Sequence, residues 1–568
     1  MKTKATDSGK IFLSVLNRKK NRVTLVFLFL FVFTKMPANN IIISNVSITG
    51  QNTTLDYAMI QFDISWDNSW RNDVAGPGNA APYNWDAAWV FIKYKACGSD
   101  WQHATLSSVD SDHFAPGGST IKTGLTNGLG KGAFIFRNAN GTGTFSLTGV
   151  QLRWNYGVDG VPDNVSVTLK PFAIEMVYVT QGTLNLSTVD HTPITMANFR
   201  SPGLSSITSE NALPLAALRW TSFNNNWDGP SGQSDALTAN YPKGYKDFYC
   251  MKYQTSQEQY VDFLNCLTYS QQVTRTCAST PPSFPVGARA LTCGNPATGN
   301  GIAIATSGTS PNTPAVYGCD FNNNTIFNES GDGQNIACNY MGWGDEIAYA
   351  DWSGLRPMSE LEFEKACRGT QPMVIDEYAW GTAAICSSNN MSPSNSGFAN
   401  ESAANSCNSA TNGNALLQPT NYVASVYTFG RPSRVGLFSN TTSTRISSGA
   451  SYYGIMDMSG NLMHFCVSVS ENCQLDPSMS IVPTYAGQFD GTMHGDGILN
   501  ASGDCNLPVI GPGNPGWPGT NMIGAGMRGG SFDAVYNING RVSDRGDNGW
   551  VHTYRNFNQG FRVVRSAP

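Results

Sequence analysis

The chain ends on two segments, Met527-Arg-Gly-Gly-Ser-Phe532 and Asn558-Gln-Gly-Phe-Arg-Val-Val-Arg565, which decide how it folds. Gly529 and Gly530 have no side chains, so the backbone there can pass close to another element. Residues 560–564 have the β-branched and aromatic content of a short buried strand. We therefore expect two fixed segments that hold an irregular stretch between them.

The stretch between these segments, residues 533–555, is polar and aromatic. Groups of this kind on a loop held by strands suit a ligand surface. A long solvated loop with internal salt bridges is the alternative, and the residues alone leave both open. The candidate ligand contacts are Tyr536, Arg541, Asp544, Arg545, Trp550, His552 and Tyr554.

The first 38 residues have the composition of an export signal. Basic residues precede an unbroken run from Val23 to Phe33 that is apolar apart from Thr24. Such a run is too short for a bilayer helix but matches the apolar region of a signal peptide, and Pro37-Ala38 is a suitable cleavage site. A retained membrane anchor is the alternative. We predict a signal peptide over 1–38, a secreted, periplasmic or cell-surface location, and no stable membrane span.

Charge and composition indicate a globular protein and argue against nucleic-acid or membrane binding. Residues 1–38 hold eight Lys and Arg and one acidic residue, which leaves 27 basic against 39 acidic residues and a net charge of −12. This sign argues against a general nucleic-acid or anionic-membrane surface. With 58 Gly, 29 Pro and only 13% charged residues, the chain is typical of a loop-rich, β-leaning globular protein.

Residues 39–182 have the pattern of a β-sandwich. Ile60, Phe62, Ile64 and Trp66 alternate with polar residues, as in a half-buried strand, and further short strands follow between turn signals. The Trp residues of this part could stack on sugars, but we favour a Trp-rich core. Residues 183–243 lose periodicity and predict a linker that packs on a second domain, 244–568.

The second domain contains two clear helix starts. Ser256 with Gln259, and Ser359 with Glu362, have the spacing of capping boxes. Glu360, Glu362 and Glu364 could suggest acid-base chemistry. We interpret them as structural, because their spacing spreads them round a helix and negative charge favours its first turn.

Thirteen cysteines follow the export signal, so disulfides are the default expectation. Cys466 with Cys473, and Cys386 with Cys407, could close short loops. The stretch 271–340 has the length and composition of an insertion, with Asn322-Asn-Asn-Thr325 and Gly331-Asp-Gly333 in its loops. We expect disulfide bonds to stabilise long irregular loops of this kind. The candidates are Cys277, Cys293, Cys319 and Cys338.

Several motifs of residues 244–568, taken in order, resemble the formylglycine-generating enzyme (sulfatase-modifying factor) family. They include Trp343-Gly-Asp-Glu-Ile-Ala-Tyr-Ala-Asp-Trp352, Tyr378-Ala-Trp-Gly381, Tyr453-Gly-Ile-Met-Asp-Met-Ser-Gly-Asn-Leu-Met-His-Phe465, Arg528-Gly-Gly-Ser-Phe532 and Gly560-Phe-Arg-Val-Val564. The resemblance implies a divergent C-type-lectin-like domain with few helices and much irregular loop. The expected fold class is therefore α+β, with an N-terminal β-sandwich before this domain.

The resemblance also implies calcium. The family holds one calcium ion at the positions of Asp457, Gly460 and Leu462, with a Glu at the position of His464. Because a neutral imidazole is a poor calcium ligand, we expect at most a weakened calcium site there. A second family calcium loop is faintly matched around Phe398-Ala-Asn400.

Copper is not expected. The family's enzymes use two cysteines after the Arg-Gly-Gly-Ser strand to bind copper, because soft sulfur holds Cu(I). Those positions fall at Ala534 and Asn539, and Cys505 is the last cysteine of the chain. The favoured hypothesis is an exported, non-catalytic binding or surface-structural protein with an unknown protein or glycan ligand. Its C-terminal loop is at the place that retroelements diversify in some proteins of this fold.

Two other functions remain open. One is a formylglycine-generating-like oxidoreductase or a metal enzyme with an unrecognised site, for which His464, His494 and Asp496 are the candidates. The other is a component of a surface assembly that uses the β-sandwich to associate.

Overall fold

Strand β2 (Tyr57–Arg71) shows why the first part of the chain folds as a sheet. Ile60, Phe62, Ile64 and Trp66 are at most 2% exposed, and the residues between them are half-buried. Alternate side chains of a strand point to opposite faces, so this pattern gives β2 one buried face. The predicted alternation is confirmed.

The computed structural model describes residues 40–73, 81–186, 199, 203–220, 232–292, 299–386, 391–417, 430–470, 485–522, 524–533, 537–549 and 554–568. The predicted signal peptide, 1–38, lies outside these residues. Within the described ranges, no helix is both long enough and apolar enough to cross a membrane.

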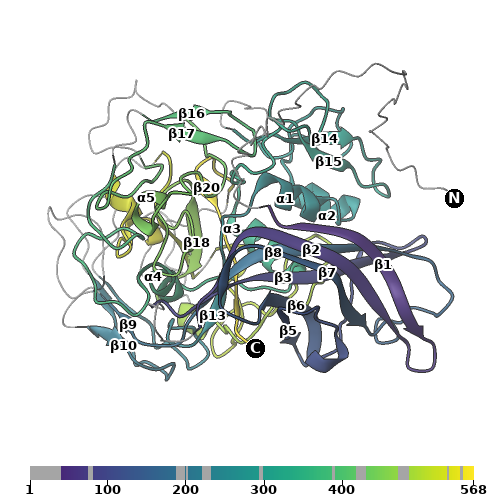
Figure 1. Cartoon of the computed structure of the whole chain (residues 1–568), viewed down its shortest axis with the longest axis horizontal. Coiled ribbons are helices and arrows are strands. Elements are labelled where there is room, and N and C mark those ends of the chain that lie inside the picture. Colours follow the sequence, from purple (N-terminus) through teal and green to yellow (C-terminus); the bar gives the residue numbers. More distant parts are fainter. Residues whose placement is uncertain are drawn as a thin grey trace, which may run out of the picture. The chain divides into compact units, whose positions relative to one another are not determined.

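Two antiparallel sheets are built from strands of residues 42–179, with two strands added from later in the chain (Figure 1). One sheet has the order β1-β2-β7. The other has the order β21-β13-β8-β3-β6-β5, with β4 paired to β3. The bounds are β1 (Ile42–Asn52), β3 (Asp86–Ala96), β4 (Gln102–His103), β5 (Ser119–Thr126), β6 (Leu129–Arg137), β7 (Gly141–Trp154), β8 (Val167–Val179), β13 (Phe248–Met251) and β21 (Val564–Ser566).

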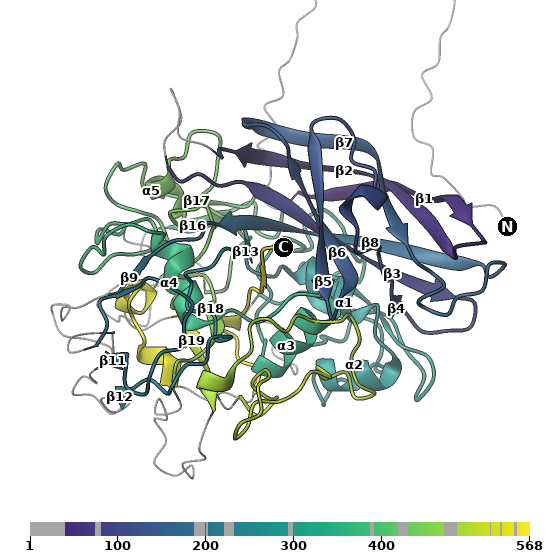
Figure 2. The ribbon, with the colours of Figure 1, turned by 90° about the horizontal axis from the view of Figure 1, so that it is seen from below.

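The larger sheet has the smaller sheet on one face and helices on the other (Figure 2). Val90 of β3 shares a buried hydrophobic cluster with Ile60 of the smaller sheet. The neighbouring Trp89 points to the opposite face, in a cluster with residues of α1 (Gln257–Leu264) and α3 (Trp343–Trp352). The fold is therefore sheet-rich α+β with few helices, as expected.

The larger sheet also joins the two parts that we predicted from sequence. Phe248 of β13 pairs with Val179 of β8 on one side and with Ser566 of β21 on the other. Strands from before and after residues 183–243 thus share backbone hydrogen bonds. Buried charges lie at the same junction, where the ammonium of Lys252 is 3.6 Å from Glu175 and 3.9 Å from Asp86.

The predicted helix starts are confirmed. Ser256 accepts a hydrogen bond from the Gln259 backbone, and the Gln259 side chain accepts from the Ser256 backbone, so both halves of the capping box of α1 form. Ser359 and Glu362 do the same for α4 (Glu360–Arg368). The other α-helices in the described residues are α2 (Tyr269–Arg275) and α5 (Arg445–Ser448).

Short strands complete the rest of the chain. A three-stranded sheet has the order β19-β18-β20, and the remaining strands form two-stranded pairs. Their bounds are β9 (Leu184–Asn185), β10 (Ser206–Ile207), β11 (Arg219–Trp220), β12 (Gly232–Gln233), β14 (Ile302–Thr306), β15 (Val316–Cys319), β16 (Ser392–Ser394), β17 (Ser402–Ala404), β18 (Met463–Val467), β19 (Ala525–Arg528) and β20 (Gln559–Gly560). In the predicted linker, Leu218 and Trp220 are buried in the main core, whereas Leu215 is 64% exposed.

The cysteines correct part of the disulfide prediction. Cys386 and Cys407 form a disulfide, as proposed. Cys466 is a free, fully buried thiol in β18, so a Cys466–Cys473 loop is wrong. Cys319 and Cys338 are also free and buried, whereas Cys277 is disulfide-bonded. These free thiols lie in the hydrophobic core, where cysteine packs as a small apolar residue.

Candidate functional site

The signature Asp457-Met-Ser-Gly-Asn461 is a turn that leads into β18. Asp457, Gly460 and Asn461 have φ values of 55°, 87° and 65°. Gly, Asn and Asp are the residues that enter this left-handed region most readily, which explains their presence here. The turn is tied to the C-terminal segment, because Gly460 N–H donates to the Gly529 carbonyl at 2.8 Å.

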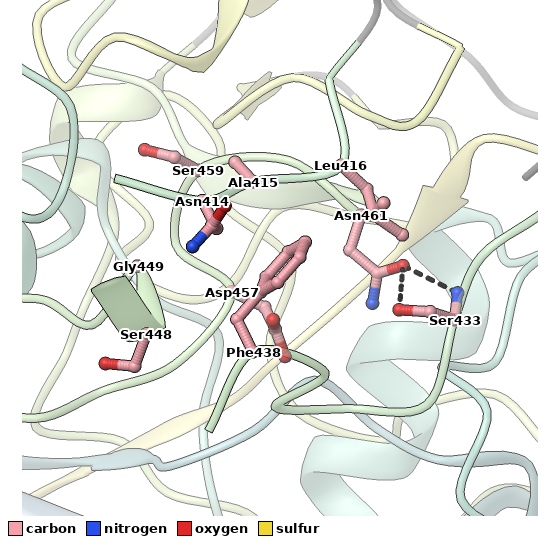
Figure 3. A pocket seen from close by; sticks show the side chains of 10 residues that line it. All are labelled: Asn414, Ala415, Leu416, Ser433, Phe438, Ser448, Gly449, Asp457, Ser459 and Asn461. Atoms are coloured by element: carbon pink, nitrogen blue, oxygen red, sulfur yellow. Dashed lines mark hydrogen bonds between the residues drawn. The ribbon is translucent and has the colours of Figure 1, made fainter. Parts of the chain in front are cut away.

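A small pocket opens beside this turn (Figure 3). Its cavity volume is about 10 Å³, which is room for roughly one water molecule and is far below the roughly 300–1,000 Å³ of ordinary small-molecule sites. Asp457 and the ring of Phe438 lie at its centre in this view. The lining residues are Asn414, Ala415, Leu416, Ser433, Phe438, Ser448, Gly449, Asp457, Ser459 and Asn461.

Two polar side chains of the pocket, Asp457 and Asn461, are held by hydrogen bonds. Asp457 Oδ2 accepts from Gly436 N–H at 2.6 Å, and burial raises the pKa of this carboxyl. Asn461 Oδ1 accepts from Ser433 N–H at 3.0 Å, and its amide donates to Gln254 Oε1 at 2.9 Å. The pocket is therefore lined by fixed hydrogen-bonding groups around one partly accessible acid.

The predicted calcium position fits a calcium ion poorly, because two of its backbone carbonyl oxygens already accept hydrogen bonds. The Asp457 carbonyl accepts from His464 Nε2 at 2.9 Å, and the Leu462 carbonyl accepts from Gln254 Nε2 at 2.7 Å. His464 is fully buried, and burial with the nearby Arg562 keeps its pKa well below the ordinary value. Each of these carbonyls therefore already accepts a hydrogen bond from a nitrogen, and His464 supplies no carboxylate for a calcium ion.

Buried interactions fix Asp544 and Arg545 of the C-terminal loop (residues 533–555). Arg545 donates through Nε and Nη2 to the two carboxylate oxygens of Glu360, at 2.7 and 2.8 Å, and both side chains are fully buried. The rings of Phe199 and Trp220 lie 4.4 and 4.1 Å from the Arg545 guanidinium carbon. Asp544 is 7% exposed. Two of the predicted ligand contacts are therefore interior residues.

Other predicted contacts are more accessible. Arg541 forms an ion pair of 3.0 Å with Asp376, and its side chain is 14% exposed. Tyr554 is 58% exposed. Tyr536, Trp550 and His552 lie outside the described residues.

Of the two positions at which the resemblance expects copper cysteines, Asn539 is described and Ala534 is not. Asn539 is 7% exposed, and its amide donates to Asp547 Oδ2 at 3.3 Å. An amide side chain offers no soft sulfur, so Asn539 does not fit a Cu(I) site.

The glutamates of α4 are structural partners of arginines. Glu360 and Glu364 each bond Arg528, at 2.9 and 2.8 Å, and Glu362 bonds Arg356 through both oxygens. All three acids are at most 2% exposed. Buried carboxylates need such pairing, and the structural interpretation of these residues agrees with it. Nothing in the local sequence indicates that Arg528 and Arg356 are their partners.

The candidates for an alternative metal site have separate hydrogen-bond partners. His494 Nε2 accepts from Ser566 N–H at 3.2 Å, whereas Asp496 N–H donates to Asp351 Oδ1 at 3.0 Å. His464 bonds the Asp457 carbonyl as described above. In the part of the chain that the structure describes, no three His, Cys, Asp or Glu side chains form a metal-binding group.

Comparison with known proteins agrees with this geometry. A search of curated proteins finds no match. The model of the sulfatase-modifying factor enzyme 1-like domain matches residues 230–567, more than half of the chain, and includes the signature turn, the pocket and both C-terminal segments. The match begins inside the stretch that we predicted to be a linker. The chain therefore belongs to the sulfatase-modifying factor enzyme 1-like family.

Proposed function

We propose that this protein is an exported, non-catalytic member of its family that binds a protein or glycan ligand through the C-terminal loop. The observation that carries the proposal is Asn539, a buried amide bonded to Asp547 where a copper-binding thiol is expected. The absence of any cysteine after Cys505 in the sequence supports it. Without thiolates the copper-dependent oxidation of a substrate cysteine has no metal site.

The way the loop is held favours binding. Arg545 and Glu360 form a buried, doubly hydrogen-bonded base for the loop. Arg541 and Tyr554, which are less buried, remain for contact with a ligand. Aromatic and arginine side chains on a rigid base are the groups that dominate recognition surfaces. Diversification of this loop by a retroelement is part of the same hypothesis and requires a repeat of the 3′ coding end nearby in the DNA.

The N-terminal strands have a supporting role in this proposal. We infer that the two sheets of residues 40–182 are the predicted β-sandwich, and that the second domain has the lectin-like fold of the family. The shared strands β8, β13 and β21 would then make the sandwich a permanent support for the loop. Residues 1–38 would direct export to the periplasm, the cell surface or the medium.

A peptide assay tests the non-catalytic part. The purified exported protein is incubated with a sulfatase-motif cysteine peptide and Cu(I), and the products are analysed by mass spectrometry. We expect no loss of the thiol and no aldehyde product. Formylglycine in the product would overturn the proposal and favour the oxidoreductase.

Ligand arrays test the binding part. Glycan and protein arrays are probed with wild type, with Tyr554→Ala, and with Phe284→Ala as a control that removes an exposed aromatic ring (41% exposed) from the insertion. We expect the loop variant to lose at least one hit that the control keeps. Equal binding by both variants would move the ligand surface away from Tyr554.

A further inference from the structure

The insertion contains a loop, residues 320–332, that neither the pocket nor the C-terminal segment uses. It follows β15, and its sequence is Asp320-Phe-Asn-Asn-Asn-Thr-Ile-Phe-Asn-Glu-Ser-Gly-Asp332. Asn328 closes the first part, because Cys319 N–H donates to its side-chain oxygen at 2.9 Å and its own N–H donates to the Cys319 carbonyl at 2.8 Å. Phe321 N–H donates to the Asp332 carbonyl at 3.2 Å, which brings the two ends of the loop together.

Three side chains at every second position accept hydrogen bonds from the backbone of this loop, and two of them, Asn322 and Asn324, are exposed. Asp320 accepts from the backbone N–H groups of Asn324 and Thr325, at 3.0 and 3.3 Å. Asn322 Oδ1 also accepts from Asn324 N–H, at 3.1 Å, and Asn324 Oδ1 accepts from Ile326 N–H at 2.8 Å. The sixth residue, Thr325, has a φ of 64°. This spacing resembles the opening of an EF-hand calcium loop, but Thr325 stands where the sixth residue is Gly and Gly331 stands where the twelfth is Glu.

Asp332 provides an independent sign of a missing ligand. It is fully buried, and its Oδ2 accepts from Glu329 N–H at 2.7 Å. Its Oδ1 is buried and makes no close hydrogen bond with a described residue, although the backbone N–H of Asn322 lies near enough to favour the charged carboxylate. An unsatisfied buried oxygen is costly, and a charged one more so. Burial, with the charges of Asp320 and Glu329, raises the pKa of Asp332.

The nearest cation does not neutralise these acids directly. Arg289 donates to the backbone carbonyl of Asp320 at 2.7 Å and to Asn323 Oδ1 at 3.1 Å. Within the described ranges, neither Asp320 nor Asp332 forms an ion pair with a Lys, Arg or His side chain. The loop therefore combines two carboxylates and amide oxygens with one neighbouring guanidinium, Arg289, which bonds the loop backbone and Asn323.

We propose that this loop binds a calcium ion through Asp320, Asn322, Asn324 and Asp332, with backbone carbonyl oxygens of the loop completing the shell. Calcium takes six to eight oxygen ligands in irregular geometry, which carboxylate, amide and carbonyl groups supply. Zinc and copper favour nitrogen and sulfur, and the loop contains no His or Cys. Its proposed ligands are different residues from those of the family loop at 398–400, against which this loop packs, and from the turn at Asp457.

The ion would connect the insertion to the body of the domain. Gly333, directly after Asp332, donates to the Gly397 carbonyl at 2.9 Å. The guanidinium of Arg431 lies 5.1 Å from the ring of Phe321. A bound calcium would hold the two ends of the loop together beside these contacts, as a disulfide bond would.

Calorimetric titration of calcium into the chelator-treated exported protein tests the site. The variants are Asp332→Asn and Asp320→Asn, which keep the size of the side chain, and Asp262→Asn is the matched control at a half-exposed pair with Lys170. Asp457→Asn tests whether calcium binds at the signature turn instead of at this loop. We expect wild type and the Asp262 and Asp457 variants to bind the same number of ions. Each loop variant should bind one ion fewer, or bind it about tenfold more weakly.

Thermal unfolding with and without calcium is a second test, and it remains informative if a variant is too unstable for calorimetric titration. Calcium at about 1 mM, the range of extracellular calcium modules, should raise the Tm of wild type but not that of Asp332→Asn. Three results would overturn the proposal: no binding by wild type, unchanged binding by both loop variants, or loss of the ion in Asp457→Asn alone.

Discussion

The guanidinium of Arg565, in the last strand, lies over the indole ring of Trp89, with 4.7 Å from its central carbon to the ring centroid. Arg565 also donates to the carbonyls of Gly354 and Leu125. Its burial, with the nearby charge of Arg356, lowers its pKa to about 9. The contact joins β21, at the edge of the larger sheet, to β3 in its interior, so the C-terminal strand is held against the sheet by a side chain as well as by its backbone.

The Trp89 ring is packed so closely that we predict a loss of stability when Gly132 is replaced by a larger residue. A Cβ atom at Gly132 would lie 2.4 Å from the Trp89 ring. We expect Gly132→Ala to destabilise the protein by about 1–3 kcal/mol, because the buried ring must shift. Gly117→Ala is the control, since a Cβ atom there meets nothing within 4 Å. Urea unfolding measures both, and equal stabilities would show that the ring has room to move.

The base of the C-terminal loop should be costly to disrupt. Arg545→Ala removes one of two guanidinium groups from the buried carboxylate of Glu360. We expect a loss of about 1.5–3 kcal/mol, because the buried carboxylate of Glu360 keeps Arg528 but loses two charge-assisted hydrogen bonds. Lys122→Ala breaks the exposed pair with Asp110 and should cost less than about 1 kcal/mol. Thermal unfolding of the two variants compares these costs, and similar values would contradict the buried role of Arg545.

The charges at the junction of the two sheet parts predict a pH dependence. Burial raises the pKa of Glu175 to about 7, above the 4.5 of an unperturbed Glu, although Lys252 opposes the shift. Between these two pH values the folded state keeps a proton that the unfolded state has lost, so this group's contribution to stability falls as pH rises from about 4.5 to 7. Glu175→Gln cannot ionise and should lack this component.

The measurement is urea unfolding of both proteins at several pH values between 5 and 8. We expect the stability of wild type relative to Glu175→Gln to decrease by roughly 1–3 kcal/mol across this range. A constant difference would mean that Glu175 is ionised in the fold throughout.

Thiol accessibility should separate Cys97 from the core cysteines. Cys97 is exposed, whereas Cys250, Cys338 and Cys466 are buried. Burial raises the pKa of each of these three thiols, which suppresses the reactive thiolate. We expect a water-soluble thiol reagent to label Cys97 first in the native protein, and Cys97→Ser to remove the fast phase. Fast labelling of Cys466, identified by peptide mass spectrometry, would contradict the packing of β18.

The sequence alone determined the features that depend on neighbours a few residues apart. The capping boxes at Ser256 and Ser359 are legible because each hydrogen bond joins residues three positions apart. The alternation in β2 and the family motifs are local in the same sense. They were sufficient for the fold class and the family, and for the structural interpretation of the α4 glutamates.

Only the tertiary structure decided which distant segments meet. The pairing of β13 with both β8 and β21, the interior position of Arg545 and the free thiol of Cys466 all depend on contacts between residues far apart in the chain. A charged or sulfur-containing side chain has the same identity on a surface loop or in the core. Its role is fixed by the partner that packing brings within reach, and that partner is absent from its local sequence.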